Sequence, residues 1–168
     1  VNNSKSNLNP NFINNGKNDK LGTFRYKAQM IHNRVDYQTP GKEEKNDEGI
    51  KRIVHRISFR KDDSPVGWSM AYFNLPYIYG STERQVENFI GADCADLVVL
   101  AHRKATGKNI PYVSARTLDR IAKTVLDRSQ IDLCGDFYCK DNIPLKFGTD
   151  VEPGYLVKFP DQSNVGML

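Results

Sequence analysis

The stretch that decides the fold is GADCADLVVLAHRKATG, residues 91–107. Asp93 is a favourable N-cap residue, and basic residues just before Gly107 are typical of the end of a helix. The apolar residues between these signals are dense enough to predict a central, buried helix over residues 94–105. The helix begins at Cys94, whose thiol is either reactive or simply packed.

A cysteine in the first turn of a helix has its thiolate favoured by the free backbone N–H groups there. The same N–H groups can hold an oxyanion, which is why cysteine hydrolases use this position. The carboxylates of Asp93 and Asp96 work against a thiolate. A histidine partner is needed, and His102 lies roughly 12 Å along the same helix, too far to touch Cys94. The alternative is a cysteine that only packs in the core.

The bulk composition describes an ordinary globular protein. The chain has 168 residues, of which 39% are hydrophobic and 26% charged, enough for one domain with a small extension. The net charge of +4 comes from scattered residues, so we expect no nucleic-acid partner. The longest apolar run, residues 97–101, is too short to span a membrane. No metal cluster or phosphate loop is recognisable, so we expect no metal and no cofactor.

Three regions are expected along the chain. Residues 1–20 are rich in asparagine and predict a disordered tail or linker. Residues 21–63 contain two alternating segments separated by a charged loop, which predict a β-hairpin extension or the end of an N-terminal β domain. In the second segment Ile53, His55, Ile57 and Phe59 share one face, which we expect to be half-buried, with His55 as a structural histidine.

The third region, residues 64–168, is the expected main domain. Thr82 and Gln85 form a capping-box pattern that predicts a short helix over residues 83–90. Ser114 is the expected cap of a second helix over residues 115–128. The last residues predict a strand, a turn at Pro160 to Ser163 and the start of another strand. Because the chain stops within an apolar stretch, we expect the domain to be incomplete at its C-terminus.

Two further cysteines, Cys134 and Cys139, lie close together in CGDFYC. They either close a small disulfide loop or are both free thiols. If they pair, Cys94 is left over, and an odd cysteine in an exported protein suggests a reactive thiol. The alternative is three reduced cysteines in a cytosolic protein.

Four segments in order resemble the NlpC-type cell-wall peptidases, which are papain-like cysteine hydrolases. They are LPYIYGS, GADCADLVVLAHRKATGKNIPYVSA, VEPGYLVKF and NVGML, within residues 75–168. In that family a Pro-Tyr-x-x-Gly segment precedes Asp-Cys-Ser-Gly at the start of the central helix, and a Pro-Gly strand leads to a His-Val-Gly strand. The resemblance implies an α+β fold with a papain-like core, in which the cysteine-bearing helix packs on an antiparallel sheet, plus the N-terminal β extension.

The resemblance also implies roles for single residues. Cys94 matches the nucleophile, and Tyr77 matches a tyrosine whose hydroxyl lies beside it and helps to hold the oxyanion. Asp93 matches the acid that holds the free amine of the peptide substrate. Further substrate contacts are expected from Asp96, Tyr79 and Ser114.

This chain departs from the family pattern at three places. Ala95-Asp96 replaces Ser-Gly after the cysteine, and Tyr155 replaces an aspartate after Gly154. Asn164 occupies the position of the general-base histidine, and an amide cannot take a proton at neutral pH.

The function expected from the resemblance is hydrolysis of amide bonds in peptidoglycan stem peptides. The alternative is a catalytically inactive NlpC-like module that binds the cell wall or a protein partner, with Asn164 as a true replacement. A papain-like acyltransferase and an intracellular structural domain are weaker alternatives. A protein partner could also bind the β extension. The family implies a secreted, periplasmic or cell-envelope location.

Overall fold

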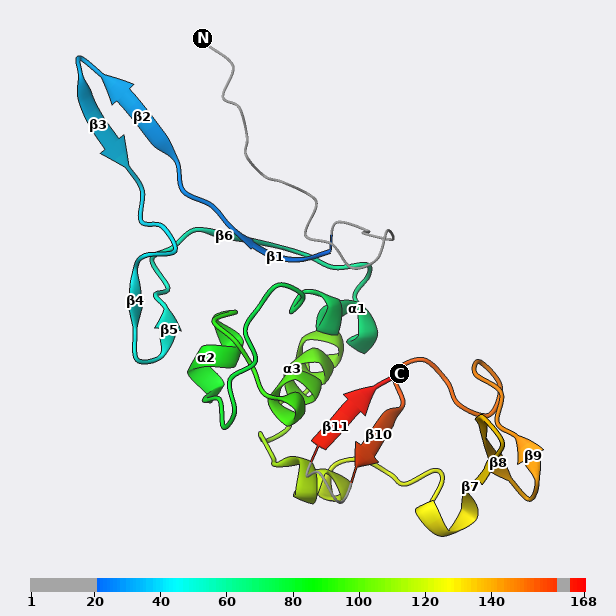
Figure 1. Cartoon of the computed structure of the whole chain (residues 1–168). Coiled ribbons are helices and arrows are strands. Elements are labelled where there is room, and N and C mark those ends of the chain that lie inside the picture. The colour runs from blue at the N-terminus through cyan, green and yellow to red at the C-terminus, as the bar shows by residue number, and fades with distance from the viewer. Residues whose placement is uncertain (1–20, 160–163) are drawn as a thin grey trace.

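The computed structural model describes residues 21–159 and 164–168. The expected tail, residues 1–20, and the expected turn, residues 160–163, lie outside the described residues. Within them the chain is a mixed α+β protein with a few helices and several small antiparallel sheets (Figure 1). The α+β class is therefore confirmed.

The helices are α1 (Pro65–Met70), α2 (Glu83–Glu87), α3 (Cys94–Thr106) and two 3-10 turns, η1 (Ala115–Arg120) and η2 (Arg128–Gln130). The strands of the extension are β1 (Gly22–Arg25), β2 (Gln29–His32), β3 (Val35–Gln38), β4 (Lys45–Asn46), β5 (Gly49–Ile50) and β6 (Arg56–Phe59). The later strands are β7 (Asp132–Cys134), β8 (Phe137–Lys140), β9 (Ile143–Pro144), β10 (Leu156–Phe159) and β11 (Asn164–Met167).

The predicted central helix is confirmed as α3. The Asp93 carboxylate accepts the Asp96 backbone N–H at its start, and Gly107 ends it with a left-handed φ of 69°. The predicted capping box is also present at the start of α2. That helix ends earlier than predicted, at Glu87, because Phe89 adopts a positive φ of 53°.

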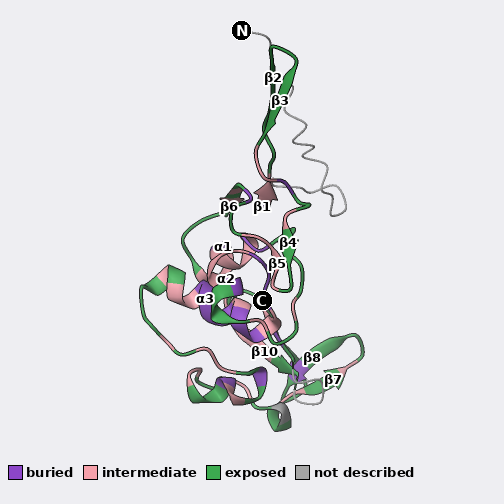
Figure 2. Cartoon of the chain, turned by 90° about the vertical axis from the view of Figure 1, so that its left-hand side faces the viewer, coloured by how far each residue is buried: buried purple, intermediate pink, exposed green. Residues whose placement is uncertain are grey.

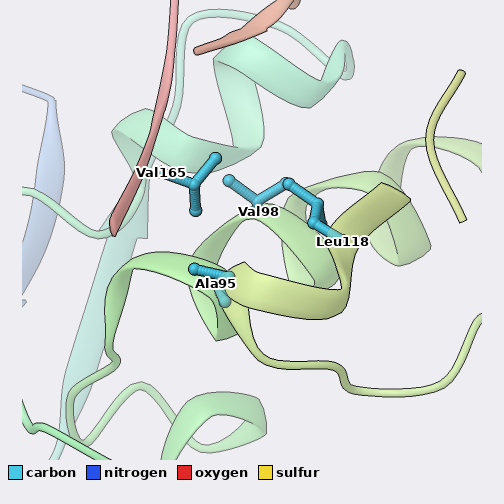
Figure 3. Close-up of a cluster of buried hydrophobic side chains, with 5 residues drawn as sticks. Ala95, Val98, Leu118 and Val165 are labelled. Carbon is cyan, nitrogen blue, oxygen red and sulfur yellow. The ribbon is translucent and has the colours of Figure 1, made fainter. Parts of the chain in front are cut away.

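The core is built around α3. One of its faces packs through Ala95 and Val98 against Leu118 of η1 and Val165 of β11, and these side chains point toward one another in Figure 3. Buried α3 residues are coloured purple in Figure 2. A second cluster brings Leu100 of α3 together with Tyr72, Val86 and Ala92. Two strands far along the chain, β10 and β11, pair antiparallel, as predicted, and β11 contacts α3 (Figure 1).

The predicted helix over residues 115–128 is wrong in type and length. The structure forms only the short 3-10 helix η1, and the Ser114 side chain does not cap it. Leu118 is buried in the core, but further along Val125 is 57% exposed. A helix gains most of its stability from packing an apolar face. Ile121 and Ala122 still pack against the core, but the exposed Val125 shows that this packing does not continue along the segment.

The predicted antiparallel pair in the extension is confirmed only at its base, where β1 pairs with β6. The end of the first predicted strand instead forms the hairpin β2–β3 with the residues that follow it, and the expected charged loop contains most of the hairpin β4–β5. The β2–β3 hairpin projects away from the helices, and both of its strands are exposed (Figures 1 and 2).

The face of β6 expected to be half-buried points outward instead. Ile57 and Phe59 are 43% and 49% exposed, and His55 is exposed and stacked on Tyr26. The opposite face turns polar side chains to the domain, since the Thr23 hydroxyl donates to the Ala71 carbonyl at 2.7 Å. The domain presents backbone carbonyls here, and these select hydrogen-bond donors rather than apolar side chains.

A small three-stranded sheet, β7–β8–β9, follows η2. A disulfide joins Cys134 of β7 to Cys139 of β8. Of the two alternatives for this pair, the structure contains the disulfide loop and not two free thiols. Cys94 is then the free cysteine of the three in the chain.

Candidate functional site

Cys94 is the first residue of α3, and the helix start leaves backbone donors beside its thiol. The first backbone N–H groups of a helix have no intrahelical acceptor. The Asp93 carboxylate accepts the Asp96 backbone N–H at 2.8 Å. The backbone N–H groups of Cys94 and Ala95 then remain available to a ligand. Such a helix start can bind an oxyanion that forms next to the sulfur.

The segment PYIYG runs beside the start of α3 and carries Tyr77. Tyr77 forms a parallel bridge with Ala92, and the Ile78 N–H donates to the Ala92 carbonyl at 3.0 Å. The tight approach depends on Gly91, where a Cβ atom would lie 2.6 Å from the Pro76 carbonyl oxygen. The backbone thus fixes Tyr77 next to Cys94.

The side chain of Tyr77 lies close enough to Cys94 for the two groups to interact electrostatically. The pKa of the Tyr77 hydroxyl is raised first by loss of solvent around it, and then by its electrostatic interactions with Cys94 and Asp93. The ring remains 64% exposed, so a substrate can reach it. At neutral pH Tyr77 keeps its proton and can donate it to a developing negative charge, but it cannot act as the base.

Ser81 connects the PYIYG segment to α3. Its hydroxyl oxygen accepts the Asp93 backbone N–H at 2.9 Å and donates to the Asp96 carboxylate at 2.6 Å. Sequence reasoning missed this residue, because nothing in the local pattern relates a serine to an aspartate 15 positions away. Through these two hydrogen bonds Ser81 fixes the PYIYG segment against the start of α3.

Asp96 has a different place from the one expected of a substrate contact. Its side chain is 8% exposed and is occupied by Ser81. Burial raises the pKa of its carboxyl, the Ser81 hydrogen bond lowers it, and the charge of Asp93 raises it again, with a net upward shift. Asp96 is therefore part of the scaffold under the site.

A groove of about 400 Å³ opens in front of Cys94. Tyr77, Asp93 and Cys94 line it together with Val165, Gly166 and Met167 of β11. The rest of its lining is mostly apolar and comes from α1, the segment after it and α3. A concave, mostly apolar site with a few polar groups is the usual form of a small-ligand or peptide site.

Besides Asp96, three other predicted site residues do not line this groove. Tyr79 is 90% exposed, and exposed Ser114 contacts the Thr117 hydroxyl at 3.1 Å. Asn164 is exposed at the start of β11, and its side-chain oxygen accepts the Val165 N–H at 2.8 Å. The structure thus brings together Cys94, Tyr77 and Asp93, with Asn164 directly before the groove-lining part of β11.

None of the three histidines of the chain lies in the groove. His32 and His55 are exposed on the extension, and half-buried His102 lies near the far end of α3. Over residues 21–159 and 164–168, no group of His, Cys, Asp and Glu side chains could hold a metal ion. In the same residues no helix is long and apolar enough to cross a bilayer.

Comparison of the chain with protein-family models, with curated proteins and with solved structures gives no match.

Proposed function

We propose that the protein is a cysteine hydrolase with an NlpC-type, papain-like core that cleaves amide bonds in peptidoglycan stem peptides. The observation that carries the proposal is Cys94 at the start of α3, in a groove that Tyr77 and Asp93 also line. The ordered sequence segments shared with that family support it. The packing of α3 against β11 of the antiparallel pair supports the fold that it requires.

In the proposed reaction the Cys94 sulfur attacks the carbonyl carbon of the scissile amide. The C–N bond then breaks, and the amine leaves with the proton that the thiol has lost. Water hydrolyses the resulting thioester and returns the free thiol. The Cys94 backbone N–H and the Tyr77 hydroxyl stabilise the oxyanion of each tetrahedral intermediate.

Asp93 has one carboxylate oxygen bonded to the Asp96 N–H, and the other remains available in the groove. We propose that this oxygen binds the free amine of the peptide substrate. A negative carboxylate next to the nucleophile selects a positively charged group on the substrate.

The second candidate is a catalytically inactive module that binds cell-wall stem peptides or a protein partner in the same groove. It is favoured by the absence of the chain's three histidines from the groove. The Asn164 amide, at the start of β11, cannot take the thiol proton.

Digestion of purified muropeptides, followed by chromatography, tests the proposal. The wild type should release product and Cys94→Ser should release none. An Asn164→His variant should release product faster, by about tenfold or more, since general acid–base catalysis contributes at least that much. If the wild type and Cys94→Ser release product equally, Cys94 is not the nucleophile.

The same experiment decides between the two candidates when a binding assay is added. Retention of both wild type and Cys94→Ser on insoluble peptidoglycan, without any release of product, identifies the binding module. Absence of both retention and release contradicts both candidates.

We also propose that the protein works outside the cytosol, as a secreted, periplasmic or cell-envelope protein. The Cys134–Cys139 disulfide supports this location, because disulfides persist in oxidising compartments and are rare in the cytosol.

A further inference from the structure

A second concave site lies between the β4–β5 hairpin and α2 and shares no lining residue with the Cys94 groove. Its volume is about 290 Å³. Its polar lining consists of Asn46, Glu48, Lys51, Arg52, Arg84 and Asn88. We call these residues the hairpin pocket.

Three cations and one carboxylate line the hairpin pocket. Arg84 forms an ion pair with Glu48, and the Lys51 ammonium bonds Glu44 at 2.9 Å. The exposed side chain of Arg52 makes no ion pair within the described residues. The pocket therefore holds more positive charge than its own carboxylates neutralise.

Two more arginines lie directly behind this lining. Arg25 and Arg56 are directly opposite each other in the β1–β6 pair, so their side chains lie on the same face of the ribbon. Arg25 donates to the Ile90 carbonyl at 3.2 Å, and Ile90 lines the pocket. Arg56 donates to the carbonyls of Ile50 and Lys51 at 2.7 and 3.0 Å.

The backbone carbonyls that accept these hydrogen bonds are neutral, so they do not compensate the positive charges of the two arginines. Neither makes an ion pair with a carboxylate in residues 21–159 and 164–168, and both Nε atoms are buried without a hydrogen-bond partner. Burial, and then the charge of Arg56, lower the pKa of Arg25. An arginine nevertheless stays protonated in a protein, so the charge persists and favours an anion nearby.

We propose that the hairpin pocket binds a small ligand that carries a phosphate group. A phosphate offers up to two negative charges and several acceptor oxygens, which suit a site crowded with guanidinium and ammonium donors. A carboxylate, with one charge, would offset less of the excess. The volume is that of a small-molecule site rather than a polymer track. This site is independent of the function proposed for Cys94.

Glu48 gives the proposal a specific consequence. Its carboxylate occupies Arg84 in the structure and would compete with an incoming phosphate. Replacing it by the uncharged Glu48→Gln should therefore tighten phosphate binding, by about threefold or more, because the like charge is removed and Arg84 is freed. A purely structural role of Glu48 would not produce tighter binding.

Calorimetric titration of the full chain with inorganic phosphate, glycerol 3-phosphate and acetate tests the ligand class. At least one phosphate compound should bind, and acetate should bind at least about tenfold more weakly than that compound. Binding of inorganic phosphate alone identifies the free ion, whereas equal or tighter binding of glycerol 3-phosphate identifies an organic phosphate. No phosphate binding up to about 10 mM, or equal binding of acetate, overturns the proposal.

Paired variants test the location. Arg52→Gln/Arg84→Gln should weaken phosphate binding by at least about tenfold, because two charge-assisted contacts are lost. The control Lys61→Gln/Lys123→Gln removes the same charge from exposed positions outside the pocket and should change binding by about twofold at most. Equal weakening in both double variants would show a general charge effect and contradict the site. Circular dichroism confirms that each variant is folded.

Discussion

Ser81 joins the segment that carries Tyr77 to the start of α3. Its hydroxyl is shared between the backbone before Cys94 and the buried carboxylate of Asp96. A buried carboxylate that loses a hydrogen-bond donor bears the cost of its desolvation. Cys94 and Tyr77 therefore line the groove, whereas Ser81 and Asp96 form hydrogen bonds that fix the backbone beneath them.

Replacing Ser81 by alanine should lower the free energy of unfolding by about 1–3 kcal/mol, because Asp96 loses its donor. The matched control is Ser114→Ala, since Ser114 is exposed and bonds only its neighbourhood in η1. This control should change stability by less than about 0.5 kcal/mol. Urea titration of the two variants measures both values, and equal effects would contradict the assigned role of Ser81.

The raised pKa of Asp96 predicts a pH dependence of stability. The folded protein binds a proton at this carboxyl more readily than the unfolded chain does. The free energy of unfolding should therefore fall as pH rises from the ordinary aspartate value through the raised folded value. Asp96→Asn removes the ionisable group and should flatten this slope in urea titrations between about pH 4 and pH 7. A slope equal to that of the wild type would contradict the assignment.

At the scale of elements, the site depends on how closely the PYIYG segment approaches the start of α3. Gly91→Ala would place a Cβ atom 2.6 Å from the Pro76 carbonyl oxygen. The segment must then move, so we expect a loss of about 1–3 kcal/mol in unfolding free energy. In Gly166→Ala the new Cβ meets its nearest neighbour, Phe159, at 3.9 Å, and stability should hold within about 0.5 kcal/mol. Thermal unfolding of the two variants makes the comparison, and equal melting temperatures would contradict it.

Local signals explain which elements the sequence could predict. The cap at Asp93, the apolar run and Gly107 all act within α3, and the helix was predicted almost to the residue. The segment after Ser114 also has a helical pattern, but whether it forms a long helix depends on whether other elements cover it. Only its first part, with Ala115 and Leu118, is buried. The β2–β3 hairpin was missed because its turn, with positive φ at Asn33 and Arg34, lacks the usual glycine signal.

The candidate site was predictable to a similar extent. The local pattern around Cys94 and its resemblance to a family identified Cys94, Tyr77 and Asp93, which the structure brings to one groove. Tyr79 was expected to share the site, but its side chain points to solvent. Spacing along the chain does not fix the direction of an exposed side chain. The tie through Ser81 joins residues that only tertiary structure makes neighbours.

At the scale of the whole molecule, the extension meets the domain through the polar side of its ribbon. Thr23 and Arg25 donate to carbonyls of the domain, while Ile57 and Phe59 face outward. The alternation of residue types predicts the strand period of β6 correctly, but it predicts that the face with Ile57 and Phe59 is buried, and this face is exposed. Which face is buried depends on what the neighbouring surface offers, and here it offers acceptors.

The three cysteines together predict a thiol count for the intact protein. Alkylation with iodoacetamide without reductant should modify one cysteine, Cys94, since Cys134 and Cys139 are joined. After reduction, all three cysteines of the chain should react. Intact-mass spectrometry counts the adducts and peptide mapping locates them. Modification of all three without reductant would contradict the disulfide and remove the support that it gives to an extracytosolic location.

The central claim is that Cys94 forms a covalent bond with a peptide carbonyl in the groove. Its most direct test is to mix the protein with purified muropeptides, quench in acid within the first turnover, and map the protein by mass spectrometry. We predict an acyl adduct on Cys94, with the mass of the product fragment that carries the new carboxyl group less one water, and none in Cys94→Ser. Product release without an adduct on Cys94, or an adduct on another residue, would contradict the account.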